Sequence, residues 1–312
     1  MLVEGLMRTV FFTFITPTFN RVDKIHRVFE SLCQQTLRSF EWIVIDDGSK
    51  DGTKEQIKAY QQEADFEIHY YYKENEGKTS ALALGIPMAK GELIIIADSD
   101  DCFVAETVEK FSEAWLKLTE DEQEKCNGIL ALCVTQNGQN IGEDYRNEGY
   151  YNPIDFAFGG EIERVGENWI ASNATILKKH WVLNDAEKML GFIPESHFWN
   201  KIVMSEKPIA YRINQRLRIF YVNENEPSLS VGIRKKAPKG LHFDAHYFIT
   251  HYTDLLWKYP KPYLKHLLKY ALFTQYLGYG FFVGLQRLPL MVKILYSLAY
   301  PFAFLLRNRY FR

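Results

Sequence analysis

The sequence predicts an α/β protein in which helices sandwich a mainly parallel sheet, followed by a helical C-terminal extension that is aromatic and basic. Apolar, β-branched runs alternate with stretches whose apolar residues recur at helical spacing. The connections between these runs are too long for hairpins, so the strands are expected to run parallel. The composition changes again after about residue 240, where aromatic and basic side chains gather.

The first two strands open the alternation. Residues 10–16 are apolar and stop at Pro17 and Asn20, which predicts a buried strand that ends in a turn. Apolar residues then recur at helical spacing over residues 22–32. A second apolar run, residues 42–45, predicts the next strand, and it ends abruptly in a polar turn.

Three further strands follow in the same order. Ser49 or Asp51 can cap a helix after the second strand. The remaining elements of this half are a strand at residues 68–72, a small-residue helix at 79–89, a strand at 93–97, a helix at 104–118 and a strand at 129–134.

The second half of the chain is less regular. Loops are predicted over residues 136–168, a helix over 185–205 and one or two short strands over 211–222, before a linker at 235–240. We therefore expect a sheet domain over residues 1–238, with halves at 1–135 and 136–238, and a helical extension over 239–312.

The charge distribution separates the extension from the body. The formal net charge of the chain is −2. Residues 241–312 carry nine Lys and Arg against two acidic residues, a charge of +7, which leaves −9 on the rest. An acidic body with a basic, aromatic tail does not fit a nucleic-acid-binding protein and indicates a tail that meets anionic lipid. The four cysteines show no paired spacing, which predicts a reducing, cytoplasmic compartment.

The tail contains one long apolar segment. Residues 288–306 include a single charge, Lys293, and two prolines, Pro289 and Pro301. Their length reaches the lower limit for a membrane-spanning helix. The basic and aromatic residues around them favour helices that lie in the membrane interface. We expect peripheral attachment at the inner face of the cell membrane, with a spanning helix and a packed soluble helix as alternatives.

Polar side chains follow the predicted parallel strands at their carboxyl ends, where ligands bind in such sheets. Asp98 and Asp100 follow the fourth strand, and residues two apart in an extended chain point the same way. Two carboxylates that face one site require a cation, and oxygen-only ligands favour Mg²⁺ or Mn²⁺. The alternative is a polar loop that caps the following helix.

Two other polar positions are candidates for ligand binding. Asp47 ends the second strand, where a carboxylate can hydrogen-bond a base or a ribose. Lys78 follows Gly77 at a predicted helix start, and a helix N-terminus with a lysine suits a phosphate. Each residue also has a simpler interpretation, a turn with a helix cap for Asp47 and a solvated surface lysine for Lys78.

Four polar runs occur in a fixed order along the first half of the chain. They are Thr16-Pro17-Thr18-Phe19-Asn20, Asp46-Asp47-Gly48-Ser49, Asn75-Glu76-Gly77-Lys78 and Asp98-Ser99-Asp100-Asp101. Together they resemble the family-2 glycosyltransferases of the GT-A fold, the inverting type of bacterial surface-polysaccharide synthesis. The resemblance is strong over residues 9–135 and weak over 136–230.

The resemblance implies a nucleotide-sugar donor, and we expect a UDP-sugar. It implies that the first two runs hold the base and ribose, that the lysine contacts the nucleotide, and that the Asp-x-Asp run handles the sugar nucleotide with Mn²⁺ or Mg²⁺. The residues at these positions are Pro17, Thr18, Asp47, Lys78, Asp98 and Ser99 for the donor, and Asp100 for the metal.

Enzymes of this type place a catalytic carboxylate on a later helix, in an acidic pair shortly before a tryptophan. Here Glu195 precedes Trp199, and the pair is reduced to one acid beside Pro194. The resemblance implies that Glu195 takes the proton from the acceptor hydroxyl. Since the pair departs from the common Glu-Asp form, Asp185 and Glu187 stay as alternatives, and Glu195 can instead be a capping residue.

The sequence therefore predicts a metal-dependent inverting glycosyltransferase that acts on a saccharide or lipid-linked saccharide acceptor. One other function class is a nucleotidyltransferase that makes nucleotide sugars, but its Gly-rich, Arg- and Lys-bearing loop does not follow residues 10–16. Another is a non-catalytic binding protein that has kept the GT-A fold. The reduction of the acidic pair to Glu195 alone is the reason to consider it. Hydrolysis of UDP-sugars with Mn²⁺ distinguishes that protein from the enzyme.

Overall fold

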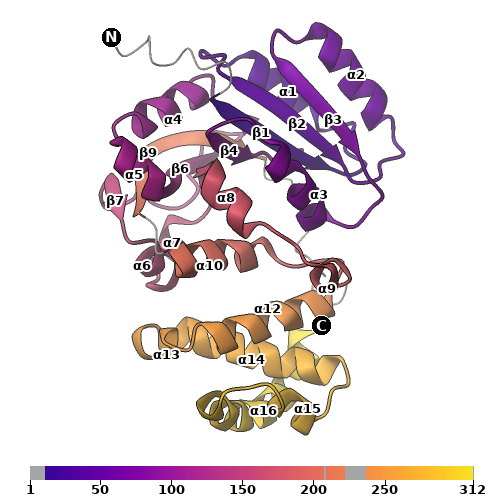
Figure 1. Cartoon of the computed structure of the whole chain (residues 1–312), viewed down its shortest axis with the longest axis vertical. Helices are drawn as coiled ribbons and strands as arrows, with labels where there is room; N and C mark the ends of the chain where they lie inside the picture. The colour runs from indigo at the N-terminus through magenta and orange to yellow at the C-terminus, as the bar shows by residue number, and fades with distance from the viewer. Residues whose placement is uncertain (1–10, 207–208, 222–236, 312) are drawn as a thin grey trace. The chain divides into compact units, whose positions relative to one another are not determined.

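The computed structural model describes residues 11–206, 209–221 and 237–311 (Figure 1). The chain divides into two compact units. The first unit comprises Met1–Val182 and Lys201–Val222, and the second comprises Leu183–Asn200 and Asn223–Arg312.

The first unit is built on a sheet in the order β3-β2-β1-β4-β8-β6-β9-β5, with β7 paired to β9. Its strands are β1 (Phe12–Thr18), β2 (Phe40–Asp46), β3 (Glu67–Tyr72), β4 (Leu93–Ile96), β5 (Cys102–Phe103), β6 (Cys126–Thr135), β7 (Gly149–Tyr151), β8 (Asn168–Asn173) and β9 (Ile209–Phe220). Strands β1 to β4 pair in parallel, whereas β8 runs antiparallel between β4 and β6. The predicted α/β class is confirmed, and the second half of the sheet is mixed.

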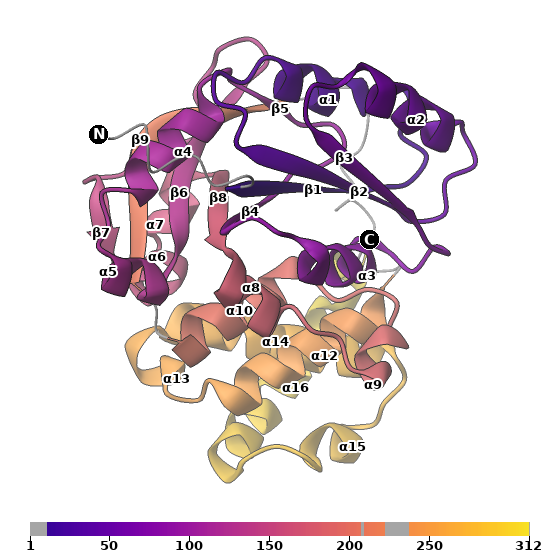
Figure 2. The same ribbon diagram turned by 45° about the horizontal axis from the view of Figure 1, so that its top comes forward.

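Helices cover both faces of the parallel half of the sheet. The helices of this unit are α1 (His26–Cys33), α2 (Thr53–Glu63), α3 (Lys78–Gly85), α4 (Thr107–Trp115), α5 (Glu120–Lys125), α6 (Pro153–Phe158), α7 (Glu161–Val165) and α8 (Ala174–His180), with a 3-10 turn η2 (Ile86–Met88). Figure 2 shows α1 and α2 on one face of β1 and β2, and α3 on the other. Phe29 of α1 and Tyr60 of α2 stack at 3.9 Å over Trp42, while Gly85 of α3 lets that helix approach Ile15 and Ile45.

Strand β1 runs two residues further than the sequence predicts. Val10 lies outside the described residues, and Pro17 and Thr18 belong to the strand and pair with β2. Ala97 N–H donates to Ile15 O, so the backbone groups of Ile15 face β4, and those of Pro17, two residues later, face the same side. Strand β4 has ended at Ile96 by that point. The missing N–H of Pro17 therefore costs no ladder hydrogen bond.

Residues 136–168 were expected as loops, and this expectation is wrong in part. The segment includes β7, α6 and α7. Helix α6 forms because Asn152 accepts hydrogen bonds from Ile154 N and Asp155 N, and Pro153 takes the first helical position, where its missing N–H is not needed. The strand expected at 211–222 is one long strand, β9, as far as the described residues reach.

The described part of the second unit is helical. Its helices are α9 (Asp185–Lys188), the first turns of α10 (Glu195–Glu206), α12 (Pro238–His251), α13 (Leu255–Lys258), α14 (Pro260–Tyr276), α15 (Phe281–Leu285) and α16 (Leu290–Tyr310). Aromatic side chains form its core, with Tyr263, Phe273 and Tyr296 fully buried. The predicted helical, aromatic extension is confirmed. The predicted linker at 235–240 lies partly outside the described residues, and its described end begins α12.

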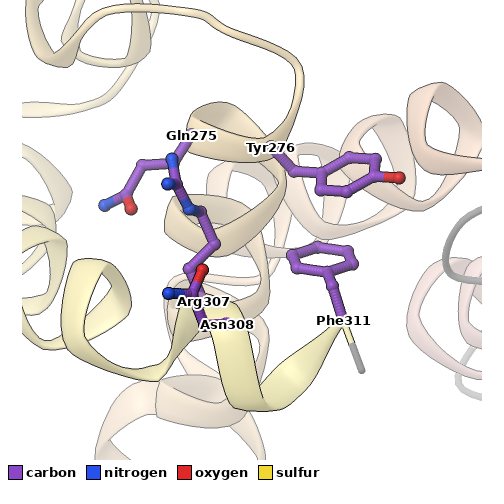
Figure 3. A pocket seen from close by; sticks show the side chains of 5 residues that line it. All are labelled: Gln275, Tyr276, Arg307, Asn308 and Phe311. Carbon is purple, nitrogen blue, oxygen red and sulfur yellow. The ribbon is translucent and has the colours of Figure 1, made fainter.

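Helices α14 and α16 also form an open pocket of about 480 Å³, shown in Figure 3. Tyr276 and Phe311 stack at 4.0 Å on one side of it, and Gln275, Arg307 and Asn308 complete the lining. Helix α16 is the one described helix that is long and apolar enough to cross a membrane, judged by length and composition alone.

Candidate active site

The parallel register brings several predicted site residues to one edge of the sheet. Strands β1, β2 and β4 are neighbours, and Thr18 pairs with Asp46 at their carboxyl ends. Asp47 follows β2 directly, and Asp98 follows β4 after Ala97. This edge is where ligands bind in open α/β sheets.

Asp47 organises the loop that leads into α3. Its Oδ1 accepts hydrogen bonds from Lys73 Nζ at 2.9 Å and Glu76 N at 3.0 Å, and its Oδ2 accepts one from Gly77 N at 2.7 Å. The residue is 3% exposed. The turn expected of Asp47 is made instead by Asp46, whose Oδ1 accepts from Ser49 N. Lys73 was not predicted as a site residue.

Thr18 presents an unsatisfied polar atom at the same edge. Its side chain is buried, and its Oγ1 has no hydrogen-bond partner among the described residues. A buried hydroxyl without a partner costs roughly 1–3 kcal/mol. A bound ligand that hydrogen-bonds to Oγ1 would recover part of this cost.

Lys78 and Asp98 form an ion pair across the edge. Lys78 is the first residue of α3, as predicted, and its Nζ lies 2.6 Å from Asp98 Oδ1. Arg218 Nη2 of β9 lies 3.6 Å from Asp98 Oδ2. Burial alone would raise the pKa of Asp98, but the positive charges of Lys78 and Arg218 outweigh burial and hold this pKa below its usual value.

Asp101 is the buried partner of Arg218. Arg218 Nη2 lies 2.7 Å from Asp101 Oδ1, and Asp101 Oδ2 accepts a hydrogen bond from Asp98 N at 2.9 Å. Burial raises the pKa of Asp101, and repulsion from Asp98 adds to the rise, against the opposing charge of Arg218. Arg218 was not predicted, because it lies on β9, 117 positions beyond Asp101, and no local pattern marks it.

The expected extended geometry of the Asp-x-Asp run is wrong. Strand β4 ends at Ile96, and Asp101 N donates to Asp98 O at 2.9 Å, which closes a turn over residues 98–101. The rule that residues two apart point the same way therefore does not apply here. Instead, Asp98 and Asp101 share Arg218, Ser99 is buried, and Asp100 is half-buried with no ion-pair partner among the described residues.

The carboxylates of this turn fit a divalent cation. Carboxylate oxygens are the ligands that Mg²⁺ and Mn²⁺ prefer. Asp98 is already paired with Lys78, whereas the Asp100 carboxylate has no competing cation among the described residues. Of the two carboxylates, Asp100 is therefore the one that is open to a cation.

Glu195 belongs to the second unit, as the first residue of α10, and is half-buried. Of the two alternatives, Glu187 is committed to a capping box with Asn184, in which each side chain accepts from the other's backbone N–H. The Asp185 side chain is 99% exposed and pairs with Lys188. A carboxylate bound in a capping box or fully exposed to solvent is poorly placed to act as a catalytic base. Glu195 therefore stays the strongest candidate in this unit.

The first turn of α10 is anchored by a buried pair. His197 Nδ1 lies 3.4 Å from Asp244 Oδ1 of α12, and both side chains are almost fully buried. The rings of Phe243 and Tyr247 pack against the imidazole. Glu195, two residues before His197, is thus held at a well-anchored helix end.

Comparison with known proteins places these residues in a family. The sequence model of the family described as "Glycosyl transferase family 2" matches residues 13–121, which include the polar ends of β1, β2 and β4. The chain carries a family 2 glycosyltransferase domain.

Curated glycosyltransferases match this domain, and some of them match most of the chain. The chain is 37% identical over 115 residues to an uncharacterized glycosyltransferase of Rickettsia bellii, but this match spans 16% of that protein. It is 28% identical over 233 residues to the GalNAc(5)-diNAcBac-PP-undecaprenol beta-1,3-glucosyltransferase of Campylobacter jejuni, a match that covers 72% of this chain and 68% of that protein.

Solved structures show the same fold over nearly the whole chain. The TarS structure from S. aureus aligns with 96% of this chain and 53% of its own, with a TM-score of 0.61 and 17% identity. TarS 1–349 in complex with UDP-GlcNAc aligns with 93% of this chain and 79% of its own, with a TM-score of 0.54 and 16% identity. At these identities the likeness establishes the GT-A fold.

Proposed function

We propose that this protein transfers a sugar from a nucleotide sugar, a UDP-sugar in our assignment, to a saccharide acceptor with inversion at the anomeric carbon. The observation that carries the proposal is the ion-paired carboxylate turn at the ends of three parallel strands. The fold it shares with TarS, one structure of which is a complex with UDP-GlcNAc, supports the donor class.

The nucleotide end of the donor is assigned to β1 and β2. Pro17 and Thr18 shape the edge, and the unpartnered Thr18 Oγ1 offers a hydrogen bond to the base or ribose. Asp47 uses three of the roughly four acceptor positions of a carboxylate, so one remains for a ligand N–H or O–H.

The diphosphate end is assigned to the turn after β4. Asp100 would hold Mn²⁺ or Mg²⁺, with Asp98 and Ser99 beside it. When bound there, such an ion would supply positive charge to offset the charge that develops on the leaving diphosphate. Lys78, at the positive N-terminus of the eight-residue helix α3, adds a second source of positive potential for the phosphates.

The proton of the acceptor hydroxyl is assigned to Glu195. As the hydroxyl oxygen attacks the anomeric carbon, its proton passes to the carboxylate, and the bond from that carbon to the diphosphate oxygen breaks with inversion. The buried pair of His197 and Asp244 keeps the first turn of α10 rigid, which favours a defined position for the base.

We propose a lipid-linked saccharide as acceptor and a cytoplasmic protein held peripherally at the inner face of the cell membrane. Helix α16 supports this: its inner face buries Val292, Tyr296 and Ala303, while its outer face exposes a continuous apolar stripe. That stripe consists of Leu290, Ile294, Leu298, Phe302 and Leu305. The lipid-linked substrate in the name of the Campylobacter jejuni relative points the same way.

A donor screen tests the proposal. Full-length protein is incubated with UDP-, GDP- and dTDP-sugars, with Mn²⁺ and with chelator, and release of the nucleoside diphosphate is measured. We expect release from one or two UDP-sugars with Mn²⁺ only. Failure of every nucleotide sugar to bind or react, in a protein that remains folded, contradicts the proposal.

A further inference from the structure

A second group of polar side chains lies at the amino edge of the parallel strands, away from the carboxylate turn. Glu41 is the second residue of β2, and Glu67 and His69 belong to β3, where Glu41 pairs with Glu67 and Ile43 with His69. Since Glu67 and His69 are two apart on a strand, they share a face. One oxygen of each glutamate and Nε2 of His69 lie within 4.8 Å of one another.

Glu41 is the buried member of this group. Its side chain has no exposed surface. Its Oε1 accepts hydrogen bonds from Thr13 Oγ1 and Lys90 N, both at 2.7 Å, whereas the buried Oε2 has no hydrogen-bond partner among the described residues. A buried carboxylate oxygen requires a nearby positive charge or donor to offset its desolvation.

Both glutamates point at the same ring nitrogen. His69 Nε2 lies 3.3 Å from Glu41 Oε2 and 3.2 Å from Glu67 Oε2. A ring nitrogen carries at most one proton, so it can donate one well-directed hydrogen bond, here to Glu67. Glu41 Oε2 is left facing the same ring nitrogen without a hydrogen bond from the described residues. A cation placed among the three atoms would satisfy all of them.

We propose that Glu41, Glu67 and His69 bind Zn²⁺. Zinc takes nitrogen and carboxylate ligands at roughly 2.0–2.2 Å in a tetrahedron, which places neighbouring ligand atoms roughly 3.3–3.5 Å apart. The two nitrogen–oxygen distances, 3.3 and 3.2 Å, lie at the short end of this spacing. Three protein ligands leave a fourth position for water, and the exposure of His69 (31%) and Glu67 (61%) gives the ion a path from solvent.

Lys90 occupies the cation position in this structure. Its Nζ lies 3.1 Å from Glu67 Oε2 and 3.7 Å from Glu41 Oε2. The Lys90 side chain is 57% exposed, so it can move into solvent when a metal enters. Lys90 therefore competes with zinc, and its removal should strengthen metal binding.

The zinc site is structural and independent of the proposed sugar transfer. It joins β2 and β3 directly, and through the other Glu41 oxygen it connects to Thr13 of β1 and to the backbone just before β4. A bound ion would thus fasten four strands at the edge opposite the donor. The metal proposed at Asp100 is a different ion at the other edge.

Metal binding to the tag-free full-length protein tests the inference. The protein is stripped with chelator, and Zn²⁺ is titrated against a chromophoric chelator in an Asp98→Asn, Asp100→Asn background that removes the donor-site carboxylates. We expect one zinc per chain. His69→Asn and Glu67→Gln should each weaken binding at least tenfold, Lys90→Ala should tighten it, and His26→Asn, a half-buried histidine of α1, should leave it unchanged.

Co²⁺ provides a second readout that does not depend on activity. A tetrahedral Co²⁺ site gives intense visible absorption, which should appear in the background protein and disappear in His69→Asn. Failure to take up stoichiometric zinc overturns the proposal. So does zinc uptake that His69→Asn leaves unchanged, or a loss of uptake in Lys90→Ala while the apo melting temperatures of all variants agree.

Discussion

Lys78 Nζ lies 2.6 Å from Asp98 Oδ1, so an ion pair joins the N-terminus of α3 to the turn after β4. The ion pair fixes the position of the Asp98 carboxylate and offsets part of its negative charge. The neighbouring Asp100 has no such cation among the described residues. Within this one turn, Asp98 is thus held by an ion pair, whereas the Asp100 carboxylate is available to a metal.

Asp100→Asn should abolish sugar transfer and leave the fold intact. The amide is a poorer ligand for Mn²⁺ and carries no charge, whereas the apo protein loses repulsion within an acidic turn. The melting temperature without metal should therefore hold or rise. Product formation with Mn²⁺ and differential scanning calorimetry check the two parts. Near wild-type turnover in this variant would refute the assignment of Asp100.

Arg218→Ala should destabilise the protein, and Arg218→Lys should do so less. Removing the guanidinium leaves Asp101 buried without its partner, and breaking a buried pair in this way costs about 3–5 kcal/mol. Lysine keeps the charge but cannot reach Asp98 and Asp101 with a planar fork. Urea unfolding of both variants measures the difference. Equal stability of Arg218→Ala and wild type would show that the pair contributes nothing.

Arg218 also shows where prediction from the sequence ends. The polar runs at Asp47, Lys78 and Asp98 could be predicted because each directly follows or precedes a strongly patterned element. Arg218 reaches the site through long-range pairing of β6 with β9, which no local period reveals. The turn at 98–101 was missed for a related reason, since strand propensity does not say at which residue β4 ends.

The same contrast applies to the fold as a whole. The alternating apolar runs predicted the parallel strands β1 to β4, because buried strands between helices have a strong local signal. The insertion of β8 between β4 and β6 was not predictable, because it depends on pairing between segments far apart in the chain.

The second unit should lose stability as the pH falls from about 6.5 to about 4. Burial, aided by the charge of His246, lowers the pKa of His242 to about 4. The unfolded chain therefore binds a proton near pH 6.5, whereas the folded chain binds it only near pH 4, and the free energy of unfolding falls by about 3 kcal/mol across this window. Thermal unfolding at pH 7, 5.5 and 4.5 should show a smaller decline in His242→Gln, which can still hydrogen-bond Thr274. An identical decline in both proteins would contradict this, although His246 retains a contribution of its own.

Leu298→Glu should release the protein from anionic membranes. Leu298 is 63% exposed at the centre of the apolar stripe of α16, and burying a leucine is worth about 1.5–3 kcal/mol. Binding to vesicles of equal phosphatidylglycerol and phosphatidylcholine at low salt should therefore weaken by about 10- to 100-fold, as measured by co-sedimentation. Val182→Glu, at an apolar position 56% exposed in the first unit, is the matched control. If the wild type, Leu298→Glu and Val182→Glu all sediment equally with the vesicles, the stripe does not contact the membrane and contacts another partner.

Glu195→Gln should slow transfer and spare donor binding. Glutamine keeps the shape of the side chain and removes its basicity, and a positioned general base contributes about 10²–10⁴-fold to the rate. Initial rates of transfer should fall by that factor, while UDP affinity measured by calorimetry stays within about threefold, because Asp47 and Asp100 are unchanged. Asp185→Asn, at a side chain 99% exposed, is the control and should retain the wild-type rate. A joint loss of UDP binding and transfer in Glu195→Gln would make Glu195 a structural residue, and full transfer would exclude it as the base.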